Sequence, residues 1–325
     1  MSYECGFGGG VADEVRAHRG RAVLRTRLRF RETFWCDLER LVYWILLPAL
    51  LVLGLAQADF ADIAVGRFVA ALIGSCLVGA ALALATRRFA VGSDGPAFTS
   101  LFQGTVRFNN YVGLTIITAL YAADGLSLAA LANAVLVPVG NVLSILALAR
   151  FGGHDGVRPR VVHAVVTNPL VLACAVGLTL NVVSRTGAAA VLWVAPASEM
   201  ILTSAQMLLH VLGQAALPVG LLCVGAGLRI PQSWRPAARV IGTSVVLRLV
   251  CVPAATLLLC RVVNLSGPAG ITVVMFAALP TATSSYLLAR RLGGDAPLMA
   301  TITAAQTVVA FVTLPAWILL SRAVL

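Results

Sequence analysis

Two polar stretches inside long apolar runs decide the fold of this chain: residues 103–113, QGTVRFNNYVG, and residues 277–285, AALPTATSS. Gly and Asn tolerate non-helical backbone and Pro280 removes a helical hydrogen bond, so each stretch is expected to interrupt a helix. The two stretches occupy matching positions in the two halves of the chain, because Asn109 and Pro280 are 171 residues apart. We therefore expect two interrupted helices whose opposed breaks form a polar site near the middle of the membrane. Two kinked helices packed through Ser and Thr are the simpler alternative.

The composition around these stretches is that of a membrane protein. Hydrophobic residues make up 59% of the 325 residues and charged residues only 11%, whereas soluble domains carry about 25% charged residues. A membrane-spanning helix takes about 20 mostly apolar residues. We predict an all-α polytopic membrane protein with nine membrane helices: Leu41–Ala56, Phe68–Thr86, Phe98–Ala123, Leu126–Ala149, Ala164–Ser184, Met200–Leu228, Val240–Cys260, Val262–Ala289 and Ala296–Ser321.

Arginines in the connecting loops indicate the topology, because cytoplasmic loops carry an excess of basic residues. Alternate loops along the chain contain few arginines, namely Arg67, Arg185 and Arg261. The other loops carry many more: Arg87, Arg88, Arg150, Arg158, Arg160, Arg229, Arg235, Arg239, Arg290 and Arg291. We expect this second set to be cytoplasmic, together with the N-terminus, and the C-terminus to be external.

The chain divides into two similar halves behind a polar segment. Pro48 recurs as Pro218, and Asp124 recurs as Asp295 at nearly the same spacing. With an odd number of helices in each half, the second half is inverted across the membrane. The expected divisions are an Arg-rich segment 1–37, a first inverted repeat 38–149, a cytoplasmic loop 150–163 and a second inverted repeat 164–325.

One helix of the repeat has no partner. The same spacing places a counterpart of Ala164–Ser184 at or before residue 1, where the chain instead carries Arg16, Arg19, Arg21, Arg25, Arg27, Arg29 and Arg31. An Arg at the bilayer centre costs at least ~2.5–3.5 kcal/mol, so this segment cannot span a membrane. We expect that the chain as given lacks a first membrane helix, through a misassigned start or reading frame or through true loss.

Arg107 is the most informative charge, because a cation at membrane depth needs a partner. All 13 Asp and Glu lie outside the apolar runs. An anionic substrate is therefore a candidate counter-charge, and backbone carbonyls are the alternative. Arg248, in the first half of its apolar run, is expected to extend toward the cytoplasm instead.

The predicted substrate-binding residues are polar side chains at the two interruptions and at two mid-helix positions: Arg107, Asn109, Asn110, Asn133, Thr281, Thr283, Ser284 and Gln306. We predict Pro280 as the break of the second interrupted helix. Asn141 is assigned a structural role.

The sequence lacks the residues that several other classes of protein require. The chain contains no Lys, which excludes P-loops and Schiff-base enzymes. It has neither an H-E-x-x-H motif nor an acidic pair in an apolar run, so we expect no enzyme, and the absence of C-x-x-C argues against a zinc site. We expect no cofactor. The arginines separate apolar runs and line no basic groove, so nucleic acid is not an expected partner.

With these residues in place, the chain resembles the auxin efflux carrier family, in its bacterial branch. The resemblance covers residues 32–321 and rests on several short motifs: Leu38 to Tyr43 with Leu47 to Leu50, Gln103-Gly104 with Arg107 and Asn109, Asn168-Pro169-Leu170, Leu217 to Gly220 with Gly225-Ala226, Leu247-Arg248-Leu249 with Pro253, Ala278 to Ser284, Gly293-Gly294-Asp295 and Gln306-Thr307.

The resemblance implies a ten-helix fold of two inverted five-helix repeats, similar to bile-acid symporters and sodium/proton antiporters. A scaffold there supports a transport domain with two crossing broken helices. Family members move small organic anions such as auxin, malate or malonate. This chain departs from the family in lacking the apolar first helix and a proline in its first interruption.

The expected protein is therefore a permease that moves small organic anions, mono- or dicarboxylates, across the inner (cytoplasmic) membrane by alternating access. Its expected partners are the substrate and the lipid bilayer, and a homodimer is left open. Two rivals remain: a sodium-coupled symporter of the bile-acid type, and a non-transporting membrane sensor or scaffold.

Overall fold

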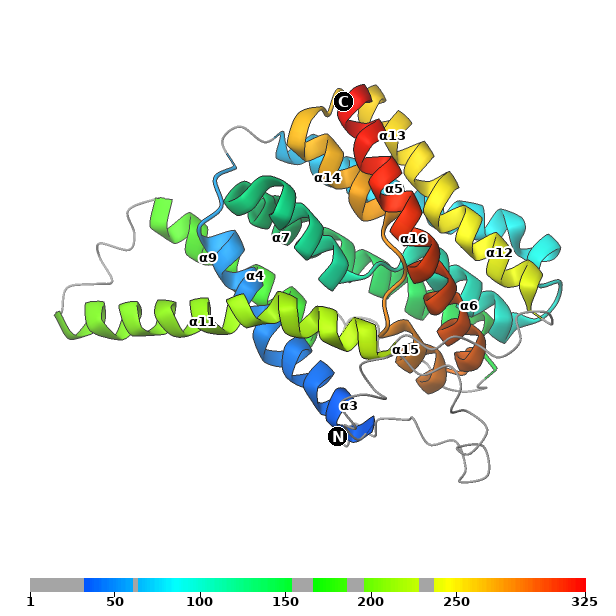
Figure 1. Ribbon diagram of the computed structural model, residues 1–325, viewed down its shortest axis with the longest axis horizontal. Helices are drawn as coiled ribbons and strands as arrows, with labels where there is room; N and C mark the ends of the chain where they lie inside the picture. The colour runs from blue at the N-terminus through cyan, green and yellow to red at the C-terminus, as the bar shows by residue number, and fades with distance from the viewer. Residues whose placement is uncertain (1–31, 61–63, 154–165, 186–195, 228–236) are drawn as a thin grey trace.

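The computed structural model describes residues 32–60, 64–153, 166–185, 196–227 and 237–325, and all regular structure in these ranges is helical (Figure 1). The elements are α3 (Glu32–Leu41), η2 (Val42–Leu46), α4 (Leu47–Ala56), α5 (Val65–Ala90), α6 (Gly95–Val106), α7 (Asn110–Phe151), α9 (Pro169–Arg185), α11 (Pro196–Gly227), α12 (Ala238–Val246), η3 (Leu247–Cys251), α13 (Val252–Val262), α14 (Gly267–Ala278), α15 (Ser285–Arg291) and α16 (Ala296–Val324). The predictions for the Arg-rich segment up to residue 31, and for most of the loop 150–163, lie outside the described residues.

Six helical segments in the described ranges are long and apolar enough to cross a membrane: Thr33–Ala56, Val65–Ala90, Asp124–Phe151, Thr203–Val224, Ala238–Val262 and Ala296–Val324. The apolar helices α9 and α14 are shorter. Large apolar side chains on the outer surface are exposed, as Phe311 and Leu319 on α16 show. Such a surface is stable in lipid and not in water, so the chain is an all-helical multi-pass membrane protein.

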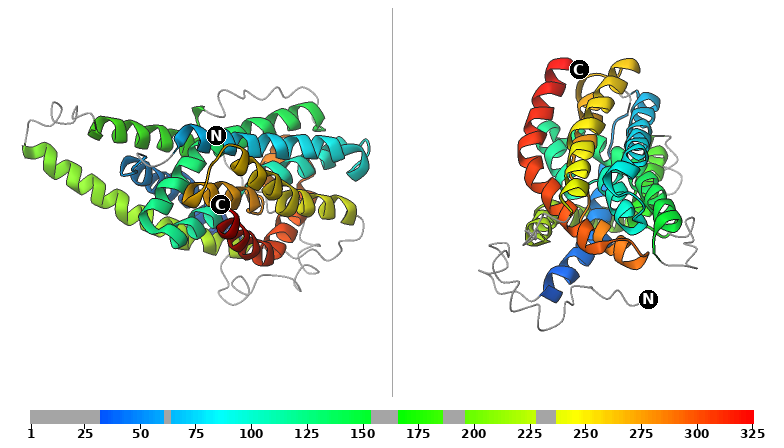
Figure 2. Two further views of the ribbon diagram at one scale, coloured as in Figure 1. Left: turned by 90° about the horizontal axis from the view of Figure 1, so that it is seen from above. Right: turned by 90° about the vertical axis from the view of Figure 1, so that its right-hand side faces the viewer.

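The helices pack in two groups on either side of α7 (Figures 1 and 2). In the first group, here the α4 group, α4 lies against α9 and α11, and α3 and η2 also contact α11. The second group, here the α5 group, joins α5, α6, α12, η3, α13, α14, α15 and α16. Because α7 contacts helices of both groups, it forms the boundary between them.

Both interruptions lie where the sequence predicts them. The helix that begins as α6 stops at Val106 and resumes as α7 at Asn110. The helix that begins as α14 stops at Ala278 and resumes as α15 at Ser285. Leu279 is extended, as expected of a residue that precedes a proline. A further break is the kink of α7 at Ala122, with φ 50°, which lies next to the predicted boundary between the spans Phe98–Ala123 and Leu126–Ala149.

Ends of helices with predicted cytoplasmic arginines gather at one end of the molecule. The Arg87 guanidinium lies over the rings of Phe98 and Phe151, at 5.2 and 4.3 Å from their centroids. Next to Phe151, the Gly153 amide donates to the Gly293 carbonyl at 2.8 Å. The end of α5, the start of α6, the end of α7 and the loop before α16 therefore meet.

Candidate functional site

The two interrupted helices touch through their unwound backbone. The amide of Asn109 donates to the carbonyl of Pro280 at 2.8 Å, and the hydroxyl of Thr281 donates to the carbonyl of Gln103 at 3.2 Å. The first bond replaces the helical bond that the Asn109 amide loses at the interruption, and the second adds to the bond that the Gln103 carbonyl accepts from the Arg107 amide at 2.9 Å. The residues that the sequence aligns, Asn109 and Pro280, are thus in direct contact.

Gln306 of α16 holds this crossing from the side. Its side chain is fully buried and accepts from the amide of Thr281 at 2.9 Å. Its amide nitrogen donates to the carbonyl of Gly104 at 2.9 Å and to the hydroxyl of Ser244 at 3.0 Å. A Cβ at Gly104 would stand only 2.5 Å from that hydroxyl oxygen. Gln306 therefore joins both interruptions to α12, and it does not line the pocket described below.

Arg248 corrects a prediction: its side chain does not extend to the membrane surface. It is 4% exposed, lies in the π-helical turn η3, and donates only to backbone carbonyls of the interrupted helices. Nε reaches Leu279 at 2.7 Å, Nη2 reaches Phe276 at 2.9 Å and Nη1 reaches Thr105 at 3.1 Å.

The reason lies in the missing helical donors. The carbonyl of Phe276 would accept from residue 280, which is a proline without an amide hydrogen. The carbonyl of Thr105 would accept from Asn109, whose amide turns to Pro280 instead. Carbonyls at helix ends need other donors, and one guanidinium supplies them for both helices. Arg248 is a structural cation.

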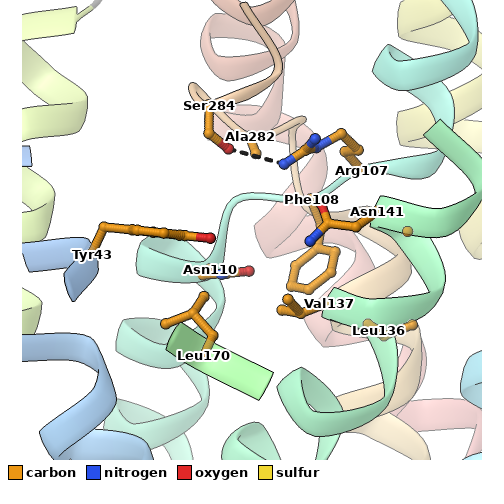
Figure 3. A pocket seen from close by; sticks show the side chains of 11 residues that line it. Tyr43, Arg107, Phe108, Asn110, Leu136, Val137, Asn141, Leu170, Ala282 and Ser284 are labelled. Atoms are coloured by element: carbon orange, nitrogen blue, oxygen red, sulfur yellow. Dashed lines mark hydrogen bonds between the residues drawn. The ribbon is translucent and has the colours of Figure 1, made fainter. Parts of the chain in front are cut away.

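Arg107 has different surroundings. It follows the last residue of α6 in extended conformation and lines a small pocket with Asn110, Ala282 and Ser284 of the interruptions (Figure 3). Its Nη2 donates to the hydroxyl of Ser284 at 3.1 Å. No ion pair within the described ranges includes Arg107: those present join Arg40 to Asp37 and Arg185 to Asp59.

The pocket lies between the two groups of helices. Its wall includes Tyr43 of η2 and Leu170 of α9, from the α4 group, and Leu136, Val137, Gly140 and Asn141 of α7. Its volume is about 40 Å³, and a buried water molecule needs about 10–15 Å³. In this conformation the pocket has room for a few waters but not for an organic anion.

Three polar side chains share the pocket with Arg107 and Ser284. Figure 3 shows the hydroxyl of Tyr43 and the side-chain amides of Asn110 and Asn141 pointing into the same space. Asn141, which the sequence analysis assigns a structural role, is therefore a lining residue. Its mid-helix amide gave the same signal as that of Asn133, so only the rotation of α7 separates the two.

Two of the predicted asparagines do not line the pocket. Asn133 is 1% exposed and donates to the carbonyl of Ala129 in its own helix at 2.8 Å. Asn109 caps α7, since its side-chain oxygen accepts from the amides of Tyr111 and Val112 at 3.1 and 3.3 Å. Thr281 is fully buried in the crossing.

Sequence reasoning missed one acidic residue. Glu39 precedes the predicted first span, but the helix already begins at Glu32, so Glu39 lies inside it. Its carboxylate accepts from the hydroxyl of Thr283 at 3.0 Å. Glu39 does lie outside the apolar runs, but the helix that carries it brings its carboxylate to Thr283 of the second interruption.

Comparison with known proteins agrees with this architecture. No curated protein matches the chain. Residues 157–318, however, match the family described as membrane transport protein, and this stretch contains Arg248 and the second interruption. The chain belongs to this family of membrane transport proteins, that of the auxin efflux carriers.

Proposed function

We propose that this protein is a secondary transporter that moves small organic anions, mono- or dicarboxylates, across the inner (cytoplasmic) membrane by alternating access. The observation that carries the proposal is the Arg107 guanidinium. It faces a pocket at the crossing of two interrupted helices, and its hydrogen bond in the described structure is to a neutral hydroxyl. A buried cation of this kind attracts a carboxylate, which its two-pronged donor geometry fits.

The position of the pocket supports alternating access. The pocket is lined from both groups of helices and is too small for a dicarboxylate, so binding requires the groups to separate. Sites at the interface of two helix bundles open in this way when one bundle moves against the other. The α4 group would be the scaffold, and the α5 group, with both interruptions, the moving domain.

The order of the helices supports two inverted repeats with boundaries near 38–149 and 164–325. Helices α6 and α14 both contain 12 residues, and both lead into an interruption. Each is preceded by a long span, Val65–Ala90 or Ala238–Val262. Each interruption is followed by a short helical piece and a second long span, which ends α7 in the first half and forms α16 in the second. In the proposed topology of nine spans with a cytoplasmic N-terminus, the arginine-bearing end of α5 faces the cytoplasm.

Arg248 favours this function over a sodium-coupled symporter. In transporters with broken helices, carbonyls of the unwound segments and of the adjoining half-helix C-terminal ends commonly coordinate the coupling sodium ion. Here a guanidinium already binds three such carbonyls. We therefore propose transport without sodium.

The test is counterflow of labelled carboxylates in proteoliposomes that contain the full chain, with a panel of acetate, malonate, malate and citrate. We expect exchange of at least one of them at a rate unchanged when choline replaces sodium. A rate that falls to background in choline would favour the sodium symporter. Absence of exchange for the whole panel, in protein that is folded, would contradict transport of small carboxylates and favour the sensor.

A further inference from the structure

Glu39 brings a carboxylate to the edge of the proposed substrate pocket. It lies on α3, four residues before Tyr43, and residues four apart share a helix face. Tyr43 lines the pocket. The partner of Glu39, Thr283, belongs to the interruption that also supplies Ala282 and Ser284 to the pocket wall.

The same short segment thus binds both a carboxylate and a guanidinium. Thr283 binds Glu39, and the next residue, Ser284, binds Arg107. The carboxylate and the guanidinium are thus bound by consecutive residues of the second interruption, and they form no ion pair with each other.

The other titratable groups near Glu39 come from three elements. Tyr111 of α7 and Cys223 of α11 are close enough to interact with its charge, and Tyr43 lies one turn along its own helix. Arg40, the next residue in the chain, lies 3.6 Å from the carboxylate of Asp37. The phenol and thiol groups are neutral near pH 7, so the charged groups on this part of α3 are Asp37, Glu39 and Arg40.

We propose that Glu39 is the proton-binding group of this transporter, and that one proton crosses the membrane with each anion. The inference rests on the proposed function. An anion enters the pocket only when the two groups of helices separate, which breaks the hydrogen bond of Thr283 to Glu39, and a carboxylate that loses this donor binds a proton more readily. Since such coupling is reciprocal, protonated Glu39 favours binding of the anion.

The hydrogen bond to Thr283 links the proton to movement. It joins α3 in the α4 group to an interrupted helix of the α5 group, so it must break when the groups separate. A hydrogen bond to an ionised carboxylate is about twice as strong as one between neutral groups. Protonation therefore weakens this link. The only covalent bond made or broken is the O–H bond of the carboxyl group, whose proton comes from water on one side of the membrane and is released to water on the other.

The test compares Glu39→Gln with Asp37→Asn in proteoliposomes. A pH gradient is imposed across the membrane, and the uptake of labelled malate is measured. Asp37 is the matched control, because it lies on the same helix with its side chain 73% exposed. One proton per anion allows up to about tenfold accumulation of labelled malate per pH unit. We expect wild type and Asp37→Asn to approach this limit. Glu39→Gln should accumulate no malate above equilibrium but retain malate counterflow without a gradient within about threefold.

A second measurement needs no variant. Between pH 6 and 8, in weak buffer, purified wild-type protein should take up about one proton for each malate bound. Binding of malate without proton uptake would overturn the inference, and so would wild-type accumulation by Glu39→Gln. A wild-type protein that neither binds nor exchanges malate would instead remove malate from the proposed function, and the proton measurement would then use the panel's best substrate.

Discussion

The two arginines of the crossing, Arg107 and Arg248, show how neighbouring cations in one membrane protein differ in role. Arg248 is 4% exposed and donates to three carbonyls, so its donors face backbone that no helical amide reaches. Arg107 is partly exposed to the pocket, and its donor bond is to the hydroxyl of Ser284. One guanidinium completes the fold, and the other faces space that a ligand can enter.

The difference arises from the ends of the helices that each arginine meets. Arg248 crosses the carboxyl ends of α6 and α14, where helical carbonyls lack donors. Arg107 itself stands in the interruption, beyond the end of α6, and its side chain meets hydroxyl and amide side chains. A cation buried against carbonyls contributes to stability, whereas one beside neutral donors is available to an anion.

Replacement of Arg248 is expected to give the largest effect. Arg248→Met keeps the length of the side chain but leaves three buried carbonyls without donors, at ~1–3 kcal/mol each. We expect the free energy of unfolding to fall by about 3–9 kcal/mol, measured by thermal unfolding in detergent. Arg261→Gln, at an exposed position of α13, should stay within ~0.5 kcal/mol of wild type. Wild-type stability of Arg248→Met would remove the structural role.

Gln306 has a structural role like that of Arg248, because its side chain also holds the two interrupted helices together. Gln306→Leu leaves the buried amide of Thr281 and the carbonyl of Gly104 without these partners. We expect a loss of about 2–4 kcal/mol of unfolding free energy. The exposed Gln214 of α11 bonds His210 and provides the control, since Gln214→Leu should change stability little. An unchanged melting temperature for Gln306→Leu would mean that the crossing is held by other contacts.

Replacement of Arg107 should separate function from stability. A hydrogen bond to a charged group contributes ~1.5–3 kcal/mol, so Arg107→Gln should weaken anion binding about 10–100-fold. The free energy of unfolding should change by no more than ~1 kcal/mol, because one bond to a hydroxyl is lost.

The readout for Arg107 is the concentration dependence of carboxylate counterflow, alongside thermal unfolding. Arg107→Lys should be intermediate, since it keeps the charge but not the planar fork. Arg150→Gln, at the exposed end of α7, should leave transport unchanged. Normal transport by Arg107→Gln would show that this charge has no part in anion binding.

The interruptions and most helices could be predicted from the sequence, because Pro, Gly and Asn act locally on the backbone. The same holds for the membrane character, which depends only on composition. The role of Arg248 could not be predicted from hydropathy, since its acceptors belong to helices far away in the chain. One signal was available: Pro280 cannot donate to Phe276, so some other donor had to reach that carbonyl.

Glu39 was missed for a different reason. The first span was bounded by hydropathy, whereas the helix begins at Glu32 and carries Asp37, Glu39 and Arg40 in its first turns. A charged helical extension lowers the hydropathy without ending the helix. The choice between Asn133 and Asn141 likewise depended on helix rotation, which tertiary packing fixes.

The smallest expected effect comes from a comparison of Asn141 with Asn133, which are the same residue type on the same helix. Asn141 lines the pocket, and Asn133 is buried and donates within its own helix. A neutral hydrogen bond contributes ~0.5–1.5 kcal/mol, so Asn141→Ala should weaken carboxylate binding about 2–10-fold with little change in stability. Asn133→Ala should bind normally, because its side chain does not reach the pocket. Equal losses of affinity in both variants would mean that the site extends along α7 beyond the pocket, and that Arg107 marks only one end of it.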